Sequence, residues 1–235
     1  MSITKFLAGK ITNYNNPKSV ASRLRARRFL LMKSMIEDVF KEKSSVRIID
    51  IGGTQTYWNI LQKKYLEEKN VNIVIVNLSG TSMPHNDKLF TFVVADGCAL
   101  NDFQNKSFDI AHSNSVIEHV GDWNRMIQFA REISRVAERY FVQTPNYWFP
   151  IEPHCMTPFF HWLPKPTRIC LVSSFSLGHW RKAASIREAV TIVESANLLT
   201  RKMMKALFPD AYIFTERFLG LPKSIVATKN NSLIG

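Results

Sequence analysis

The chain has 235 residues, of which 46% are hydrophobic, enough to fill the core of one α/β domain with modest additions. No stretch approaches the roughly 18 apolar residues of a membrane span, and the first residues lack the continuous apolar segment of a signal peptide. We therefore expect a soluble, cytoplasmic protein. Three widely spaced cysteines, Cys98, Cys155 and Cys170, fit neither a disulfide framework nor paired metal-ligand knuckles, so we expect reduced thiols.

The net charge of +12 is concentrated near the N-terminus, where residues 1–47 hold 11 lysines and arginines against 3 acidic residues. Such a basic segment attracts nucleic acid, an anionic membrane surface or an anionic substrate by long-range steering. The alternative is a solvated helix face that binds no ligand.

A helix is predicted first, over residues 15–43, with Asn16 as its N-cap, Pro17 in its first turn and apolar residues at helical spacing. Five nearly continuous apolar runs follow, as in strands buried on both faces: 46–50, 71–77, 89–95, 108–113 and 139–144. Helices are predicted between the first two runs, over 57–69, and between the last two, over 122–137. Alternating strands and helices predict a parallel sheet.

Residues 144–166 form an insert that is rich in proline and aromatic residues and too long for an ordinary connection. A further helix is predicted over about 182–207. Two strand-like segments, 211–218 and 223–228, then flank a short Gly-Leu-Pro link, which requires an antiparallel hairpin. We expect an N-terminal helical cap over 1–45 and one domain over 46–235, with an insert at about 145–180.

The turn that leaves the first predicted strand reads Asp-Ile-Gly-Gly, at 50–53. Glycines at the carboxyl end of a first parallel strand let the backbone turn tightly and approach a ligand, which predicts a nucleotide-type site. A dinucleotide site requires further glycines, but Thr54 and Tyr57 occupy those positions. The carboxylate of Asp50 repels a pyrophosphate but is suited to organise the loop around a cationic amino-acid moiety, which favours a ligand that carries an ammonium group.

From this turn onward the sequence resembles the class I S-adenosylmethionine-dependent methyltransferases, in particular their small-molecule, type 11-like group, over most of residues 46–229. The resemblance rests on "DIGG" (50–53), "ADGC" (95–98) and "FDIAHSNSVIEHVGDW" (108–123), together with the order of strands and helices. It implies a Rossmann-like α/β fold with a doubly wound, seven-stranded, mostly parallel sheet whose last strand is antiparallel. The implied cofactor is S-adenosyl-L-methionine.

Carried over by position, the resemblance places cofactor-binding residues after the first four strands. Asn77 stands where the family supplies an acid to the ribose hydroxyls, although it could merely end its strand, and an amide accepts a hydrogen bond without charge assistance. Asp96 is assigned to the adenine amino group. The full predicted set is Asp50, Gly52, Gly53, Thr54, Asn77, Leu78, Asp96, Gly97, Cys98, Ser113, Asn114 and His119.

Methyl transfer from a sulfonium needs mainly positioning, but a hydroxyl or ammonium acceptor must also lose a proton. His154 is predicted as the catalytic base, with Glu152 orienting it, and the alternative is a structural histidine. Tyr147, Trp148 and Glu152 are predicted to bind the acceptor. The aromatic insert is interpreted as a lid, with simple packing or membrane contact as alternatives. The remaining histidines lack spaced partners, so no metal site is expected.

The sequence therefore predicts a methyltransferase that acts on a small or lipid-like acceptor at oxygen, nitrogen or carbon. The alternative is a nucleic-acid-binding protein or an RNA methyltransferase that uses the basic N-terminal segment, although no usual nucleic-acid module is recognisable. A nicotinamide oxidoreductase is the third hypothesis, weakened by the missing glycines.

Overall fold

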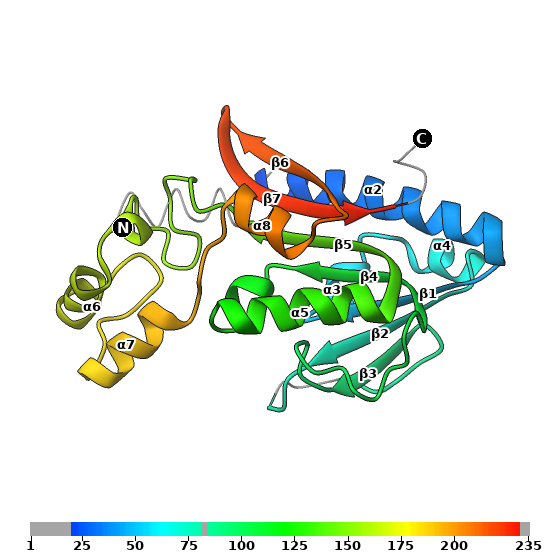
Figure 1. Ribbon diagram of the computed structural model, residues 1–235, viewed down its shortest axis with the longest axis horizontal. Helices are drawn as coiled ribbons and strands as arrows, with labels where there is room; N and C mark the ends of the chain where they lie inside the picture. Colours follow the sequence, from blue (N-terminus) through cyan, green and yellow to red (C-terminus); the bar gives the residue numbers. More distant parts are fainter. Residues whose placement is uncertain (1–19, 81–83, 231–235) are drawn as a thin grey trace.

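The computed structural model describes residues 20–80 and 84–230, and a seven-stranded sheet lies at its centre (Figure 1). The strand order is β3-β2-β1-β4-β5-β7-β6. The strands are β1 (Val46–Ile51), β2 (Val71–Asn77), β3 (Phe90–Val94), β4 (Phe108–Asn114), β5 (Ala137–Pro145), β6 (Tyr212–Phe218) and β7 (Leu221–Lys229). Strand β7 pairs antiparallel with both β5 and β6, and the other pairs are parallel. The predicted fold class is confirmed.

The ends of all seven predicted strands agree with the structure to within two residues. The last two strands form the expected hairpin, with Leu219 and Gly220 between them. Both residues have positive φ, 49° and 80°, as in the tight turns whose twist matches that of the flanking strands.

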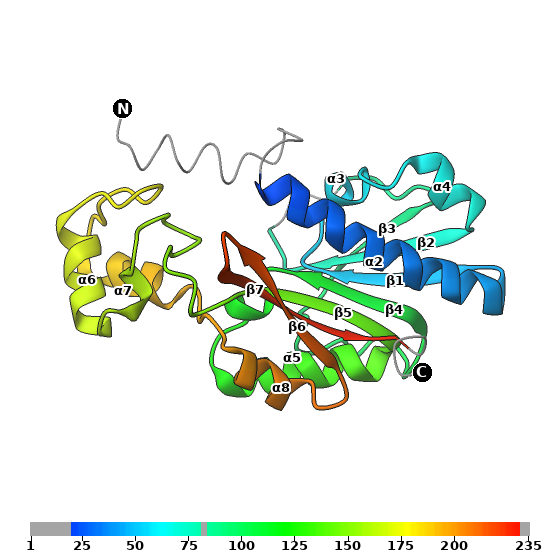
Figure 2. The same ribbon diagram turned by 90° about the horizontal axis from the view of Figure 1, so that it is seen from above.

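Helices cover both faces of the sheet (Figure 2). On one face lie α2 (Val20–Lys43), α3 (Gln55–Trp58) and α4 (Lys63–Glu68), and on the other lie α5 (Trp123–Val136) and α8 (Arg201–Leu207). Alternate side chains of β1 point to opposite faces. Ile48 packs with the α2 side of the core, whereas Ile49 and Ile51 pack with the α5 side.

Helix α2 packs along the sheet through one apolar face, on which Phe29, Met32, Ile36 and Val39 are buried. The predicted start of this helix at Asn16 and Pro17 lies outside the described residues. No helix in the described ranges is both long enough and apolar enough to cross a membrane.

Two predictions of a single long helix are wrong, because the structure has two short helices in each of these places. The 57–69 helix is replaced by α3 and α4, and Thr54 caps α3 by accepting a hydrogen bond from the N–H of Tyr57. The 182–207 helix is replaced by α7 (Ile186–Glu194) and α8. The backbone of Asn197 in the gap donates to the carbonyl of Glu118, and Thr200 caps α8, so tertiary contacts override helical propensity here.

The long insert after β5 builds a separate unit, here called the insert lobe (residues 151–194). It contains a single 3₁₀ turn, η2 (Phe160–Trp162), and the helices α6 (Lys165–Ser174) and α7. Helix α6 falls within the predicted insert but was not itself predicted. The lobe has its own small core, formed by Cys155, Phe160, Val172, Ala183, Ala189 and Val193. It stands beside the sheet, next to the N-terminal end of α5 (Figure 1).

Candidate functional site

A cavity of about 240 Å³, here called the strand-edge groove, lies at the carboxyl ends of the first three strands. Open α/β sheets bind ligands at this edge. The lining residues come from the ends of β1, β2 and β3, from the turn after β4 and from α5. They are Ile51, Gly52, Val76, Asn77, Leu78, Ala95, Asp96, Gly97, Val116, His119, Val120, Arg125 and Phe129.

Two glycines shape this groove. Gly52 has a φ of 72°, and a Cβ atom there would meet Val116 Cγ2 at 2.4 Å. A Cβ atom on Gly97 would meet Ile51 Cγ2 at 2.7 Å. Both positions therefore exclude larger residues because of the protein's own backbone and packing, before any ligand is considered.

Six of the twelve predicted cofactor residues line the groove: Gly52, Asn77, Leu78, Asp96, Gly97 and His119. The other six lie behind it or beside it. The sequence prediction missed Arg125 and Phe129, which α5 brings to the groove from 28 or more residues beyond Gly97 in the chain.

Asp50, predicted as a cofactor-binding residue that organises the loop, does not itself line the groove. Its side chain is fully buried, with Oδ2 accepting from Trp58 Nε1 at 2.6 Å and Oδ1 lying 2.7 Å from His112 Nδ1. Asp50 has the same parity along β1 as Ile48, so its carboxylate points to the α2 side, whereas the groove opens beside Ile51. Asp50 thus supports the turn from behind.

Asn114 and Ser113 also fail to face the groove. Asn114 Oδ1 accepts from Arg28 Nη1 at 2.8 Å, and Arg28 in turn forms an ion pair with Glu216 at 2.6 Å. Ser113 is fully buried within β4. These two residues belong to the packing of β4 against its neighbours, a contact between distant segments that the local sequence does not reveal.

The remaining predicted residues have roles in the loops around the groove. The Gly53 carbonyl accepts from Asn77 Nδ2 at 3.0 Å, and Thr54 is the N-cap of α3. Cys98 is buried, its thiol donates to the Arg125 carbonyl, and burial raises its pKa to about 11. These residues shape the backbone that surrounds the groove.

Asp96 lines the groove with both carboxylate oxygens engaged. Oδ1 accepts from the N–H of Cys98 at 2.9 Å, and Oδ2 accepts from Arg125 Nη2 at 2.5 Å. Although partial burial acts in the opposite direction, these two hydrogen bonds hold the pKa of Asp96 below its usual value. The carboxylate is therefore ionised at neutral pH.

His119 lies at one end of the groove and meets His154 of the insert. The two Nε2 atoms are 3.2 Å apart. His119 Nδ1 lies 2.7 Å from the Ser195 carbonyl oxygen, and His154 Nδ1 lies 2.6 Å from Glu152 Oε1. Although burial favours the neutral ring, the contact with Glu152 raises the pKa of His154 above its usual value.

Glu118, which the sequence prediction did not include, lies beside the two histidines. It is fully buried, and its Oε2 accepts from Thr144 Oγ1 at 3.0 Å. Its Oε1 is buried and has no hydrogen-bond partner among the described residues. Burial raises the pKa of Glu118 to about 7. The "EHV" element contained a signal for this group, since Glu118 directly precedes His119.

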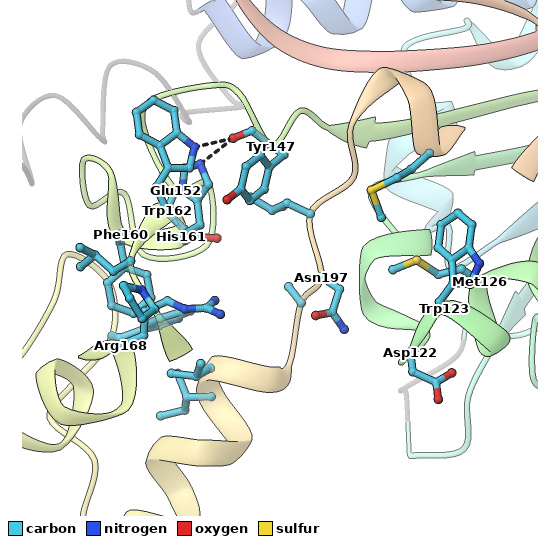
Figure 3. A pocket seen from close by; sticks show the side chains of 18 residues that line it. Asp122, Trp123, Met126, Tyr147, Glu152, Phe160, His161, Trp162, Arg168 and Asn197 are labelled. Atoms are coloured by element: carbon cyan, nitrogen blue, oxygen red, sulfur yellow. Dashed lines mark hydrogen bonds between the residues drawn. The ribbon is translucent and has the colours of Figure 1, made fainter. Parts of the chain in front are cut away.

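A second cavity, of about 610 Å³ and here called the insert cavity, lies between α5 and the insert lobe (Figure 3). Tyr147 and Glu152 line it, as do the aromatic residues Trp123, Phe160, Trp162 and Trp180. Trp148 does not line it: this side chain is 57% exposed on the outside of the insert. The Arg168 guanidinium points into the space, and its Nε has no partner among the described residues.

Residues 50–139, from β1 to the start of β5, match the family model described as a methyltransferase domain. Within these residues the chain carries a methyltransferase domain. The matched residues include every strand and turn that forms the strand-edge groove. The predicted family resemblance, the enzyme class and the cofactor S-adenosyl-L-methionine are thereby confirmed, whereas the insert lobe lies outside the match.

Solved structures that are similar to this chain have low sequence identity with it. A protein from Pyrococcus horikoshii has 16% identity and a TM-score of 0.52, over 98% of this chain and 99% of its own. A SAM-dependent methyltransferase from Methanosarcina mazei has 17% identity and a TM-score of 0.44, over 79% and 92%. Phosphoethanolamine N-methyltransferase 2 from Haemonchus contortus, in complex with S-adenosyl-L-methionine, has 14% identity and a TM-score of 0.45, over 73% of this chain but 35% of its own. No curated protein matches the chain.

Proposed function

We propose that the protein transfers a methyl group from S-adenosylmethionine in the strand-edge groove to a small, largely apolar acceptor in the insert cavity. One observation carries this proposal. His119 lines the groove, Glu152 lines the insert cavity, and His154 contacts both residues, so these three side chains form a junction between the two cavities. A cofactor and an acceptor in the two cavities would meet there.

The residues of the groove fit the cofactor. Gly52 leaves the first turn without a side chain. Asn77 ends β2 and Leu78 follows it, at the position where the family resemblance places the ribose hydroxyls. Asp96 offers an ionised carboxylate to the adenine amino group. Because Arg125 already donates to Asp96, adenine binding has to share or replace that contact. Bound S-adenosylmethionine supplies a methyl group on a positively charged sulfur, and the chain supplies positioning.

The insert cavity favours an acceptor that combines an apolar body with a negative or strongly polar group. Its aromatic walls bury apolar surface, and Arg168 places a cation inside it. A small aromatic acid or the polar end of a lipid-like molecule has this character. The Tyr147 carbonyl holds two other wall residues in place, because it accepts from His161 Nε2 and Trp162 Nε1, each at 2.8 Å.

This proposal places His154 at the reaction centre. Its ring stands at the junction, and Glu152 holds it by contact with its Nδ1 and by accepting from its backbone N–H at 2.7 Å. The Glu152 carboxylate is itself fixed by the N–H of Cys155. Because Glu152 holds both the ring and the backbone of His154, the ring has little freedom, as a group at a reaction centre requires.

The basic N-terminal segment gives no specific support for a nucleic-acid partner. Within the described part of the segment, Arg28 is paired with Glu216 and Lys43 with Asp109, and both pairs join α2 to the sheet. Residues 1–19 lie outside the described ranges. A weak, salt-insensitive affinity for RNA would accord with this interpretation.

Calorimetric titration with S-adenosylhomocysteine tests the cofactor half of the proposal. Gly52→Val should weaken binding at least 100-fold, because the new side chain enters the groove and forces Val116 to move. Gly220→Val is the matched control: Gly220 also has a positive φ, of 80°, but lies in the β6–β7 turn with open space around it. If both variants bind equally well, the groove is not the cofactor site.

A further inference from the structure

The contact between His119 and His154 has an unusual chemistry. A neutral imidazole whose Nδ1 donates a hydrogen bond presents a lone pair at Nε2. Both rings have an acceptor at Nδ1, the Ser195 carbonyl for His119 and the Glu152 carboxylate for His154. The two Nε2 lone pairs therefore face each other across 3.2 Å. Such an arrangement requires a positive centre between or beside the nitrogens, either a metal ion or an additional proton.

Glu118 supplies a third donor at the same point. One donor atom from each of Glu118, His119 and His154 lies within 4.8 Å of the others. Glu118 is fully buried, and while Oε2 accepts from Thr144, Oε1 has no partner in the described part of the chain. A buried carboxylate oxygen without a partner is costly unless something else satisfies it.

We propose that Glu118, His119 and His154 form a binding site for a divalent transition-metal ion, and that Zn²⁺ is the ion that this donor set fits best. Two imidazoles and one carboxylate with an open position form a recognised kind of catalytic zinc site. Zinc binds imidazole nitrogen at about 2.0–2.1 Å, so two ligands of a tetrahedral site lie roughly 3.3–3.4 Å apart. The separation of the two Nε2 atoms is close to this value.

The groups around the three ligands support the assignment. Metal-bound histidines usually donate their other ring nitrogen to a carboxylate or a backbone carbonyl, which fixes the ring and its tautomer. Glu152 and the Ser195 carbonyl have these positions. Magnesium and calcium prefer all-oxygen ligand sets, so two imidazoles argue against them.

Three separate segments build the site, which explains why the sequence predicted no metal. Glu118 and His119 follow β4 in η1 (Ile117–His119), whereas His154 belongs to the insert. Ser195 comes from the break between α7 and α8, which the backbone of Asn197 holds against Glu118 at 2.7 Å. The break in the predicted long helix thus brings the supporting carbonyl to His119.

The inference deepens the proposed function and rests on it in one respect, the nature of the acceptor. Because His119 lines the strand-edge groove and His154 contacts Glu152 of the insert cavity, an ion held by the three ligands would lie near both cavities. A hydroxyl oxygen bound to that ion would lose its proton to solvent at lower pH than a free hydroxyl. The acceptor class is then an oxygen-bearing molecule such as a phenol, and His154 acts as a ligand instead of a free base.

The test uses the full chain without a histidine tag, treated with a chelator and desalted. Titration with Zn²⁺ by calorimetry should show one equivalent bound, and Co²⁺ should give the intense visible absorption of a tetrahedral site. His154→Ala and Glu118→Gln should each weaken Zn²⁺ binding at least tenfold. Glu152→Gln, which changes only a supporting group, should weaken it about 10-fold to 100-fold. Exposed His85 is the control, and His85→Ala should bind as the parent does.

Absence of Zn²⁺ binding, or binding that His154→Ala and Glu118→Gln leave unchanged, would overturn the site, and the histidine contact would then be a hydrogen bond with a shared proton. Circular dichroism on each variant checks that it is folded, and Glu118→Gln preserves the side-chain volume. S-adenosylhomocysteine titrations of the same samples separate the two proposals. Zn²⁺ binding without cofactor binding would contradict the proposed function alone, and the reverse result would contradict the metal site alone.

Discussion

Two buried carboxylates, Asp50 near the end of β1 and Glu118 after β4, lie near the same edge of the sheet, and both side chains are fully buried. Both oxygens of Asp50 have partners, Trp58 and His112. Glu118 has Thr144 on one oxygen and no partner in the described residues on the other. The first carboxylate is satisfied by the fold, and the second has a position open to a ligand. Burial alone therefore does not distinguish a structural acid from a functional one, whereas hydrogen-bond satisfaction does.

Replacing Asp50 should produce the largest loss of stability. Asp50→Asn places an amide NH₂ against donors, so either Trp58 or His112 loses its acceptor inside the core. We expect a loss of about 2–4 kcal/mol in the free energy of unfolding, measured by guanidinium denaturation. A loss under about 1 kcal/mol, within the range of a surface substitution, would show that Asp50 is not the support of this turn.

Asn77 and Asn114 each end a strand, but only Asn77 lines the groove, so the same substitution at both positions tests where the cofactor binds. Asn77→Ala should weaken S-adenosylhomocysteine binding about tenfold, because a hydrogen bond worth roughly 1 kcal/mol and the contact with the Gly53 carbonyl are both lost. Asn114→Ala should change the affinity less than twofold, because its side chain contacts Arg28 and not the groove. Equal losses, measured by calorimetry, would contradict this placement.

Replacing Glu118 should have the smallest effect on stability. In Glu118→Gln the amide oxygen still accepts from Thr144, and the substitution removes a charge that the fold leaves partly unpaired. We expect the free energy of unfolding of the metal-free protein to change by less than about 1 kcal/mol. The same denaturation series as for Asp50→Asn measures it, and a loss as large as that of Asp50→Asn would give Glu118 a structural role.

The strands were predictable from the sequence because strands buried on both faces are continuous apolar runs, as in 71–77. Gly52 was predictable because a turn at that point tolerates no side chain. The side on which Asp50 points follows from the alternation that it shares with Ile48 along β1.

The rest of the site depends on contacts between distant segments. Arg28 donates a hydrogen bond to Asn114, which lies 86 residues further along the chain, and His154 contacts His119, which lies 35 residues earlier in the sequence. The break between α7 and α8 arises from the contact of Asn197 with Glu118. Neither propensity nor periodicity contains this information, because each describes only neighbouring residues.

The insert lobe leaves and rejoins the sheet domain at adjacent points. Asn146 and Leu199 form a parallel bridge, and the N–H of Tyr147 donates to the Leu199 carbonyl at 2.9 Å. With its own core between these two points, the lobe has the topology of a cassette. Exchange of this cassette would alter one wall of the insert cavity while leaving the first three strand ends in place. If the proposed function holds, substrate choice can therefore diversify during evolution, or be re-engineered, separately from nucleoside recognition.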